Sequence, residues 1–265
     1  MSEALILDIF KNFEKEFKQF KKKGKGGLIG EYFKEVGMKK ARYYMFKNTK
    51  REFVGVTRKK RVHGKTVMRY KENDYYIGGF VNGQKEGRGY HHFPNGVVFK
   101  GEYLAGKKIK GIVFNLKDKS IVYEGGWKND TYSGHGRLHK PGGSFYEGQF
   151  KNGKFNGKGK LTWKNGSFYE GSFHKGQREG QGKHVFETGD QYEGEFKENK
   201  FDGQGTFRWK TLDEYKGLFR NGRMIGSGIM GYRQLGIQGS GIWDKEGSSQ
   251  SIQFELENGT NKELF

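Results

Sequence analysis

Two segments of the sequence have the glycine and lysine spacing of a phosphate-binding loop. Gly101–Lys107 and Gly148–Lys154 both read Gly-x-x-x-x-Gly-Lys, the first part of a pattern whose backbone N–H groups and lysine cradle a nucleotide phosphate. The full pattern needs a Ser or Thr next, and a helix that presents its N-terminus to the phosphate. Lys108 and Phe155 follow instead, without a helix signal. We therefore predict no nucleotide and no other cofactor.

The 7 histidines do not have the spacing of metal ligands. His91 and His92 are adjacent and would point to opposite faces of a strand, whereas His135 and His139 lie in a predicted hairpin. The chain has no cysteine, and no carboxylate cluster accompanies the histidines. We expect no metal, no catalytic residue and no enzymatic activity, because no nucleophile–base arrangement is recognisable.

Glutamates recur at one position of a repeated motif: Glu124, Glu147, Glu170 and Glu193. They resemble a catalytic array only in their regularity. Each follows a tyrosine directly, so in a strand it would point away from the ring. We interpret them as solvated cross-strand partners of lysines such as Lys151 or Lys197.

The composition indicates a repetitive β protein with a basic surface. Of the 265 residues 32% are hydrophobic and 16% aromatic, with 45 glycines and only 2 prolines. Disordered chains are poor in aromatic residues, so disorder does not fit. No run of about 18 apolar residues is present, and no secretory signal is recognisable. The net charge of +20 favours an acidic partner, although a solvated surface without a single target explains it equally well.

The motif Tyr-x-Gly-x-aromatic recurs at a spacing of 23 or 24 residues. It opens at Phe53, Tyr76, Phe99, Tyr123, Tyr146, Tyr169, Tyr192 and Tyr215. A second glycine pattern and a third aromatic position keep register with it. In residues 146–166, alternating side chains predict two strands, and Asn152-Gly153 predicts the tight turn between them. A glycine between two rings leaves room for rings of neighbouring units to lie over the backbone.

Residues 146–166, YEGQFKNGKFNGKGKLTWKNG, resemble the MORN repeat (membrane occupation and recognition nexus) nearly position for position. The resemblance covers about residues 53–232, and the units at Phe53 and Phe99 depart from it. It implies a mostly β fold, an elongated single-layer antiparallel β-meander, with an N-terminal amphipathic helix before it. We divide the chain into a basic helix (1–24), a linker or capping segment (25–52), about eight repeats (53–236) and a degenerate C-terminal cap (237–265).

The resemblance also implies a non-catalytic scaffold, a structural subunit of a large cytoskeletal, ciliary or membrane-cortex assembly. The segments flanking the repeats are too short for a catalytic domain. Protein subunits are the expected partners, an anionic membrane surface is possible, and neither nucleic acid nor a small-molecule substrate is expected. The candidate partner-binding surface is the aromatic face: Tyr123, Trp127, Tyr146, Phe150, Trp163, Tyr169, Phe173, Tyr192, Phe196 and Trp209.

The N-terminal segment predicts an amphipathic helix, because Ile6, Ile9, Phe10, Phe13, Phe17 and Phe20 recur at helical spacing. Three roles remain open: covering the aromatic face of the sheet, docking on a partner, or lying on an anionic membrane. Basic residues crowd the same end of the chain. The candidate contacts to an acidic partner or lipid are Lys21, Lys22, Lys23, Arg58, Lys59, Lys60 and Arg61, and Lys25, Lys39, Lys40, Lys50 and Arg51 add to this charge.

Residues 26–72 carry a second resemblance. Gly26-Gly27-Leu28, Val54-Gly55 and Tyr70-Lys71-Glu72 look like a mimitin-related family of accessory subunits of mitochondrial respiratory complex I. The family's Gly-Asn and Arg-Trp stretches are absent. This resemblance implies an alternative function at the mitochondrial inner membrane. A second alternative is an anionic phospholipid-binding module.

Overall fold

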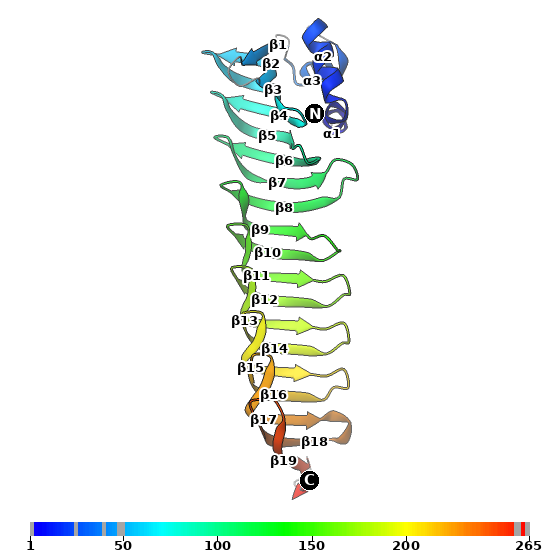
Figure 1. The fold of residues 1–265 in the computed structure, drawn as a ribbon, viewed down its shortest axis with the longest axis vertical. Coiled ribbons are helices and arrows are strands. Elements are labelled where there is room, and N and C mark those ends of the chain that lie inside the picture. The colour runs from blue at the N-terminus through cyan, green and yellow to red at the C-terminus, as the bar shows by residue number, and fades with distance from the viewer. Residues whose placement is uncertain (1–2, 24–25, 39–40, 47–50, 257–260, 263–265) are drawn as a thin grey trace. The chain divides into compact units, whose positions relative to one another are not determined.

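The computed structural model describes residues 3–23, 26–38, 41–46, 51–256 and 261–262. The chain forms two compact units, Met1–Ser133 and Gly134–Phe265. The first contains α1 (Glu3–Lys11), α2 (Phe13–Lys23), α3 (Gly27–Glu35), β1 (Arg42–Phe46), β2 (Arg51–Arg58), β3 (Arg61–Lys71), β4 (Asp74–Val81), β5 (Gln84–His92), β6 (Val97–Leu104), β7 (Lys107–Asn115) and β8 (Ile121–Lys128). The fold is mostly β with N-terminal helices, as predicted (Figure 1).

The second unit continues the hairpin pattern. Its elements are β9 (Thr131–His139, beginning just before the unit boundary), β10 (Phe145–Lys151), β11 (Lys154–Thr162), β12 (Phe168–His174), β13 (Gln177–Val185), β14 (Gln191–Lys197), β15 (Lys200–Arg208), β16 (Glu214–Arg220), β17 (Arg223–Tyr232), the 3-10 turn η1 (Arg233–Leu235), β18 (Ile237–Trp243), β19 (Ser249–Leu256) and β20 (Asn261–Lys262). In each unit, consecutive strands pair antiparallel.

Two-residue turns set the register of the hairpins. Asn152 and Gly153 join β10 to β11 with φ angles of 51° and 75°. A left-handed conformation at both central residues suits the right-handed twist of the flanking strands, and Asn-Gly adopts it at low cost. The predicted turn is therefore confirmed, and the same tip closes the phosphate-loop-like segment Gly148–Lys154 as a hairpin.

Glycines face each other across the strands of the second unit. The ladder runs through Gly136, Gly148, Gly159, Gly171, Gly182, Gly194, Gly205, Gly217, Gly228 and Gly241. The ring of Tyr146 lies over one of these pairs, and a Cβ added at Gly159 would meet its hydroxyl oxygen at 2.3 Å. That hydroxyl donates to the Gln149 carbonyl at 2.9 Å. The ring therefore requires glycine beneath it, as the spacing predicts.

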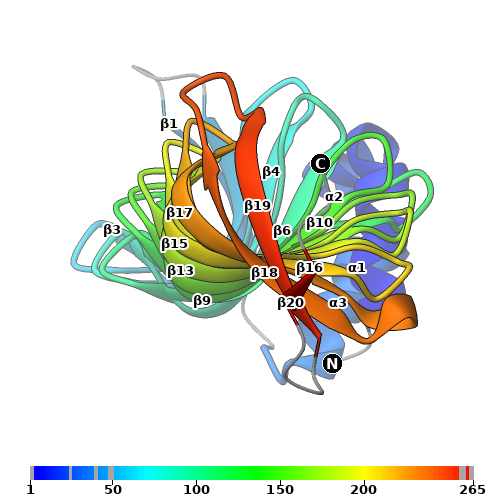
Figure 2. The ribbon, with the colours of Figure 1, turned by 90° about the horizontal axis from the view of Figure 1, so that it is seen from below.

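The N-terminal helices pack on the sheet of the first unit (Figures 1 and 2). The predicted helix over 1–24 is interrupted at Asn12, whose side-chain amide donates to the Asp8 carbonyl at 3.1 Å. The predicted linker 25–52 contains α3 and β1. The Glu16 carboxylate accepts the Leu28 N–H at 2.6 Å and so satisfies a donor in the first turn of α3.

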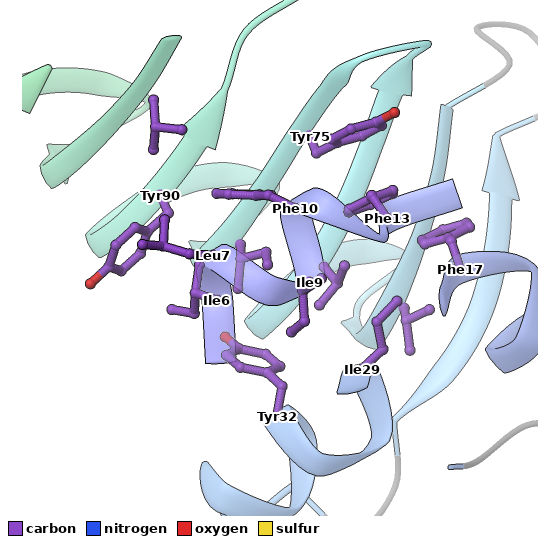
Figure 3. Packing of buried hydrophobic residues seen from close by; sticks show 14 of the residues in the cluster. Ile6, Leu7, Ile9, Phe10, Phe13, Phe17, Ile29, Tyr32, Tyr75 and Tyr90 are labelled. Atoms are coloured by element: carbon purple, nitrogen blue, oxygen red, sulfur yellow. The ribbon is translucent and has the colours of Figure 1, made fainter. Parts of the chain in front are cut away.

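The helices cover the sheet face opposite the repeat tyrosines, not the aromatic face considered above. Ile6, Ile9, Phe10, Phe13 and Phe17 pack with sheet residues Val54, Val67, Tyr75, Ile77 and Val98 (Figure 3). Tyr75 and Ile77 flank Tyr76 in β4, so they lie on the other face from its ring. Phe13 stacks on Tyr75 at 3.7 Å between ring centroids. The part of this face that the helices bury is apolar, whereas Arg88, Glu102 and Lys110 on the same face are charged.

The repeat pattern continues beyond Tyr232. Gly241 pairs with Gly228, and Trp243 pairs with Gly226. Trp243 therefore lies where the second aromatic of the motif belongs, and Gly239 replaces the first. The predicted C-terminal cap over 237–265 contains β18 and β19, and residues 257–260 lie outside the described part of the chain.

Candidate functional site

Three aromatic rings surround the residue that lies nine positions after the opening aromatic of a repeat; we call this residue the box position and the rings the aromatic box. In the repeat that opens at Tyr76 the box position is Lys85. Its Nζ lies 4.9 Å from the ring centroid of Tyr70, 4.6 Å from Tyr76 and 5.2 Å from Tyr103. These distances are those of cation–π contacts.

Two other boxes also hold a cation. Lys108 lies over Phe93, Phe99 and Trp127, at 5.1, 5.5 and 4.9 Å. Arg178 lies over Trp163, Tyr169 and Phe196, at 6.0, 5.6 and 5.5 Å. The walls come from neighbouring repeats, so the cation joins one hairpin to the next.

An aromatic ring occupies the box position in three further repeats. Tyr132 stacks on Tyr123 at 3.8 Å, Phe155 on Tyr146 at 3.7 Å and Phe201 on Tyr192 at 3.8 Å. Every box described above is thus filled by a side chain of the protein itself. The spacing pattern described above does not include this position, although Lys, Arg, Tyr or Phe stands there in six of the eight repeats and was available as a signal.

Most of the predicted aromatic contact residues are buried in this packing. Tyr123, Tyr146, Tyr169 and Tyr192 are fully buried, and Phe150, Phe173 and Phe196 nearly so. Trp127, Trp163 and Trp209 are half-buried. The accessible rings of this face are half-buried ones, which also include Tyr132, Phe155 and Phe201, and the contact role of the aromatic residues stays a prediction.

The face of the second unit opposite the repeat tyrosines carries a row of alternating charges on both sides of the glycine ladder. Arg137 pairs with Glu147 at 3.2 Å, and Lys160 pairs with Glu170 at 3.2 Å. Glu193 lies opposite Lys183 in the register of β13 and β14. Strand partners of the repeat glutamates are thus Arg137, Lys160 and Lys183, rather than Lys151 or Lys197. A shallow groove of about 770 Å³ follows this ladder between His135 and Glu193.

The predicted basic contacts are in two environments. Lys21 is engaged within the chain: its Nζ lies 3.2 Å from a Glu52 oxygen and 5.0 Å from the Tyr43 ring. Lys22 and Lys23 are exposed at the end of α2. Arg58, Lys59, Lys60 and Arg61 are exposed and form the β2–β3 turn, with φ angles of 48° and 61° at the two lysines. Lys25, Lys39, Lys40 and Lys50 lie outside the described residues.

Glu52 lies where α2 packs on the sheet and pairs with several side chains there. It accepts hydrogen bonds from Tyr43, from Lys21 and, at 2.9 Å, from Arg69, which also reaches Glu14 at 3.1 Å. Burial tends to raise the pKa of Glu52, but these donors outweigh it and hold the pKa below its usual value. Glu52 is therefore a carboxylate paired within the fold.

Within the described residues, no group of three or more His, Asp or Glu side chains is placed to hold a metal ion. No described helix is long and apolar enough to cross a membrane. The boxes and the charged groove are the two arrangements of side chains that repeat along the strands.

The MORN repeat family model matches residues 76–98, 123–145, 146–168, 169–191, 192–213 and 215–234, about half of the chain. These matches begin at residue 76, so the complex I resemblance of residues 26–72 stays a prediction. No curated protein matches the sequence.

Solved structures with some similarity include two TCP domains. One is the TCP domain of SAS-4 (dCPAP) of Drosophila melanogaster in complex with a proline-rich motif of Ana2 (dSTIL), at 13% identity and a TM-score of 0.35, covering 68% of this chain and 84% of that one. The other is a mutant TCP10 domain of Danio rerio CPAP, at 8% identity and a TM-score of 0.33, covering 80% and 93%. Similarity of this degree says nothing about function.

Proposed function

This chain belongs to the MORN repeat family, and from that premise we propose that it is a non-catalytic scaffold subunit of a larger protein assembly. The charged groove of the second unit is the observation that carries this proposal. The helices cover apolar side chains on the corresponding face of the first unit, where β5 to β8 also carry charges such as Arg88, Glu102 and Lys110. That face of the second unit is lined by Glu147, Lys160, Glu170, Lys183 and Glu193.

A partner that lies across several strands would meet the same pair of opposite charges repeatedly. Successive strands contribute a cation and a carboxylate in turn, so opposite charges follow each other at about one strand spacing (~4.8 Å). Because the pairs are partly exposed, each contributes little to stability, and exchanging them for charges on a partner costs little. Such a surface supports specificity through charge register more than through buried area.

The assembly we favour is cytoskeletal, ciliary or at the membrane cortex, which is the setting that the MORN resemblance implies. An accessory role in mitochondrial complex I and binding to anionic phospholipid are the alternatives. They predict different companions: axonemal or cortical proteins, respiratory-chain subunits, or lipid without stable protein partners.

Co-purification of the tagged full-length chain from its native cell tests the proposal. We expect defined proteins to be recovered with the wild type and lost with Lys160→Glu/Lys183→Glu, which breaks the charge alternation of the groove. Lys151→Glu/Lys197→Glu is the matched control, because it makes the same charge change at exposed lysines that do not line the groove. Recovery of the same proteins with the groove variant would reject the groove as the contact. Recovery of no protein beyond a tag-only control would reject the scaffold.

A further inference from the structure

Lys85 differs from the other boxed cations in having a histidine in line with a carboxylate. Its Nζ lies 3.0 Å from Nδ1 of His91, and Nε2 of His91 lies 2.8 Å from an Asp74 oxygen. The Asp74 carboxylate can only accept, so Nε2–H of His91 donates to it. Nδ1 of the neutral ring then carries no proton and accepts from Nζ. The result is an amine, a base and a carboxylate that orients the base.

This order of groups is the one that activates nucleophiles in proteins. A positioned histidine accepts the proton of the nucleophile, and the carboxylate behind it fixes the tautomer and stabilises the imidazolium. Side-chain exposures of 13% for His91 and 18% for Asp74 show that the pair is largely removed from water without being sealed.

The other boxes provide internal comparisons. Lys108 occupies the same position in the next repeat, but its Nζ pairs with Asp130 at 3.4 Å rather than with a histidine. Arg178 has a histidine at the same place, with Nη1 at 2.9 Å from Nδ1 of His184. A guanidinium does not lose its proton, so that pair cannot yield a nucleophile.

The electrostatic surroundings of Lys85 favour its neutral form. Burial in the box, and next the nearby charge of Lys108, lower the pKa of Lys85 to about 7, and Arg51 acts in the same direction. Asp74 and Asp130 oppose this effect without cancelling it. Burial likewise lowers the pKa of His91 to about 4, so the imidazole is neutral and free to accept a proton near pH 7.

We propose that Lys85 is a nucleophilic amine and a site of covalent acylation by small activated acyl groups such as thioesters. The Nζ lone pair attacks the carbonyl carbon, a C–N bond forms, and the nitrogen passes a proton to Nδ1 of His91 while Asp74 holds the imidazolium. The C–S bond then breaks, and the thiolate leaves and takes up the proton through solvent. The products are an amide on Lys85 and a free thiol.

The Tyr103 wall of the box contributes a further group. Its hydroxyl is buried and has no hydrogen-bond partner among the described residues. A carbonyl oxygen that reached this hydroxyl would accept its hydrogen bond, which is favourable because a buried hydroxyl without a partner is costly. This site is independent of the scaffold proposal, since it lies in the first unit and involves none of the groove residues.

The test uses the full-length chain and S-acetyl-N-acetylcysteamine, a small acetyl thioester, with acetylation at each lysine followed by mass spectrometry. At pH 7.5 we expect Lys85 to react at least about tenfold faster than Lys108, because Lys85 is largely the free amine and has a base beside it. The Lys85 rate should level off above about pH 7. In urea-unfolded chain the two lysines should react alike. Equal or slower reaction of Lys85 in the folded chain would overturn the proposal.

Variants separate the histidine's role from simple burial. His91→Phe should lower the Lys85 rate by about tenfold or more, the scale of general-base catalysis, and leave Lys108 labelling unchanged. His184→Phe, the equivalent change in the other unit, should leave both rates unchanged. Should His91→Phe not fold, Asp74→Asn gives the same expectation, and Lys85→Arg should remove the fast-reacting site from a folded chain. A Lys85 rate unaffected by folded His91→Phe or Asp74→Asn would contradict the assigned base.

Discussion

At the scale of single residues, one box accepts either a cation or a ring. Lys85, Lys108 and Arg178 occupy it in some repeats, and Phe155 and Phe201 in others. The physical reason is that a ring face carries partial negative charge, which attracts a cation, while its apolar surface suits an offset ring. The repeat therefore tolerates a change of charge at this position without a change of fold.

The glycine beneath each tyrosine has no such freedom. Gly159→Ala should destabilise the second unit by about 1–3 kcal/mol, because its Cβ would overlap the fully buried ring of Tyr146. Urea unfolding followed by circular dichroism measures the loss. Gly231→Ala is the matched control: the nearest atom to its Cβ would be 3.8 Å away, so little change is expected. Equal losses in the two variants would show that strand propensity, not the ring, causes the effect.

His184, which contacts the boxed Arg178 in the second unit, predicts a pH dependence of stability. Burial, and then Arg178, lower the pKa of His184 from 6.5 to about 4. The unfolded chain therefore binds this proton before the folded chain does, and stability is full above about pH 6.5 and falls as the pH drops toward 4. His184→Phe should remove this part of the slope. We would measure urea midpoints of both proteins between pH 7 and pH 4.5; parallel curves would contradict the assignment.

At the scale of elements, α1 and α2 act as part of the first unit's core. Phe10, Phe13, Phe17 and Phe20 are all nearly fully buried. Two ion pairs join α2 to the sheet and favour one orientation of the helix: Glu14 with Arg69 of β3, and Lys21 with Glu52 of β2. The amphipathic helix is therefore engaged within the chain, and its exposed cations include Lys15, Lys18, Lys22 and Lys23.

Phe13→Ala should weaken the packing of α2 on the sheet of the first unit. Loss of a buried phenylalanine that stacks on Tyr75 costs about 3–5 kcal/mol, and we expect faster amide hydrogen exchange in α2, β3 and β4. Lys15→Ala on the exposed side of the same helix is the control and should leave exchange unchanged. Unchanged protection of α2 in Phe13→Ala would mean that the helix is held chiefly by its ion pairs.

At the scale of the whole molecule, the net charge of +20 favours an acidic partner. The exposed β2–β3 turn concentrates part of it. Arg58→Glu/Arg61→Glu should reduce recovery of partners with the tagged chain, and wild-type recovery should weaken steeply between low and physiological salt. Lys154→Glu/Lys200→Glu makes the same change in net charge at other exposed lysines. An equal loss of partner recovery in both double variants would show that overall charge explains the effect. Full recovery with both would show that the turn is not a contact.

The repeat made much of the fold predictable from sequence. The spacing of Tyr146, Gly148 and Phe150 defines a strand, Asn152-Gly153 defines its turn, and a glycine between rings predicts the stacking that Tyr146 shows over Gly159. These features are local, or recur in each neighbouring unit, so the sequence pattern contains them. The C-terminal repeat was missed because Gly239 stands where the opening aromatic belongs, and only the pairing of Gly241 with Gly228 identifies it.

The sequence by itself thus determined the β-hairpin repeat, its register and the family, because these depend on period, turn chemistry and steric room for a ring. Only the tertiary structure decided which face the helices cover. An apolar helix stripe that includes Phe13 and Phe17 can pack on any apolar surface, so the sequence does not specify which one. The structure alone also brought Lys85, His91 and Asp74 into line. The three lie on two strands, and the distances between their side chains follow from the pairing of β4 with β5 and from the rings around them.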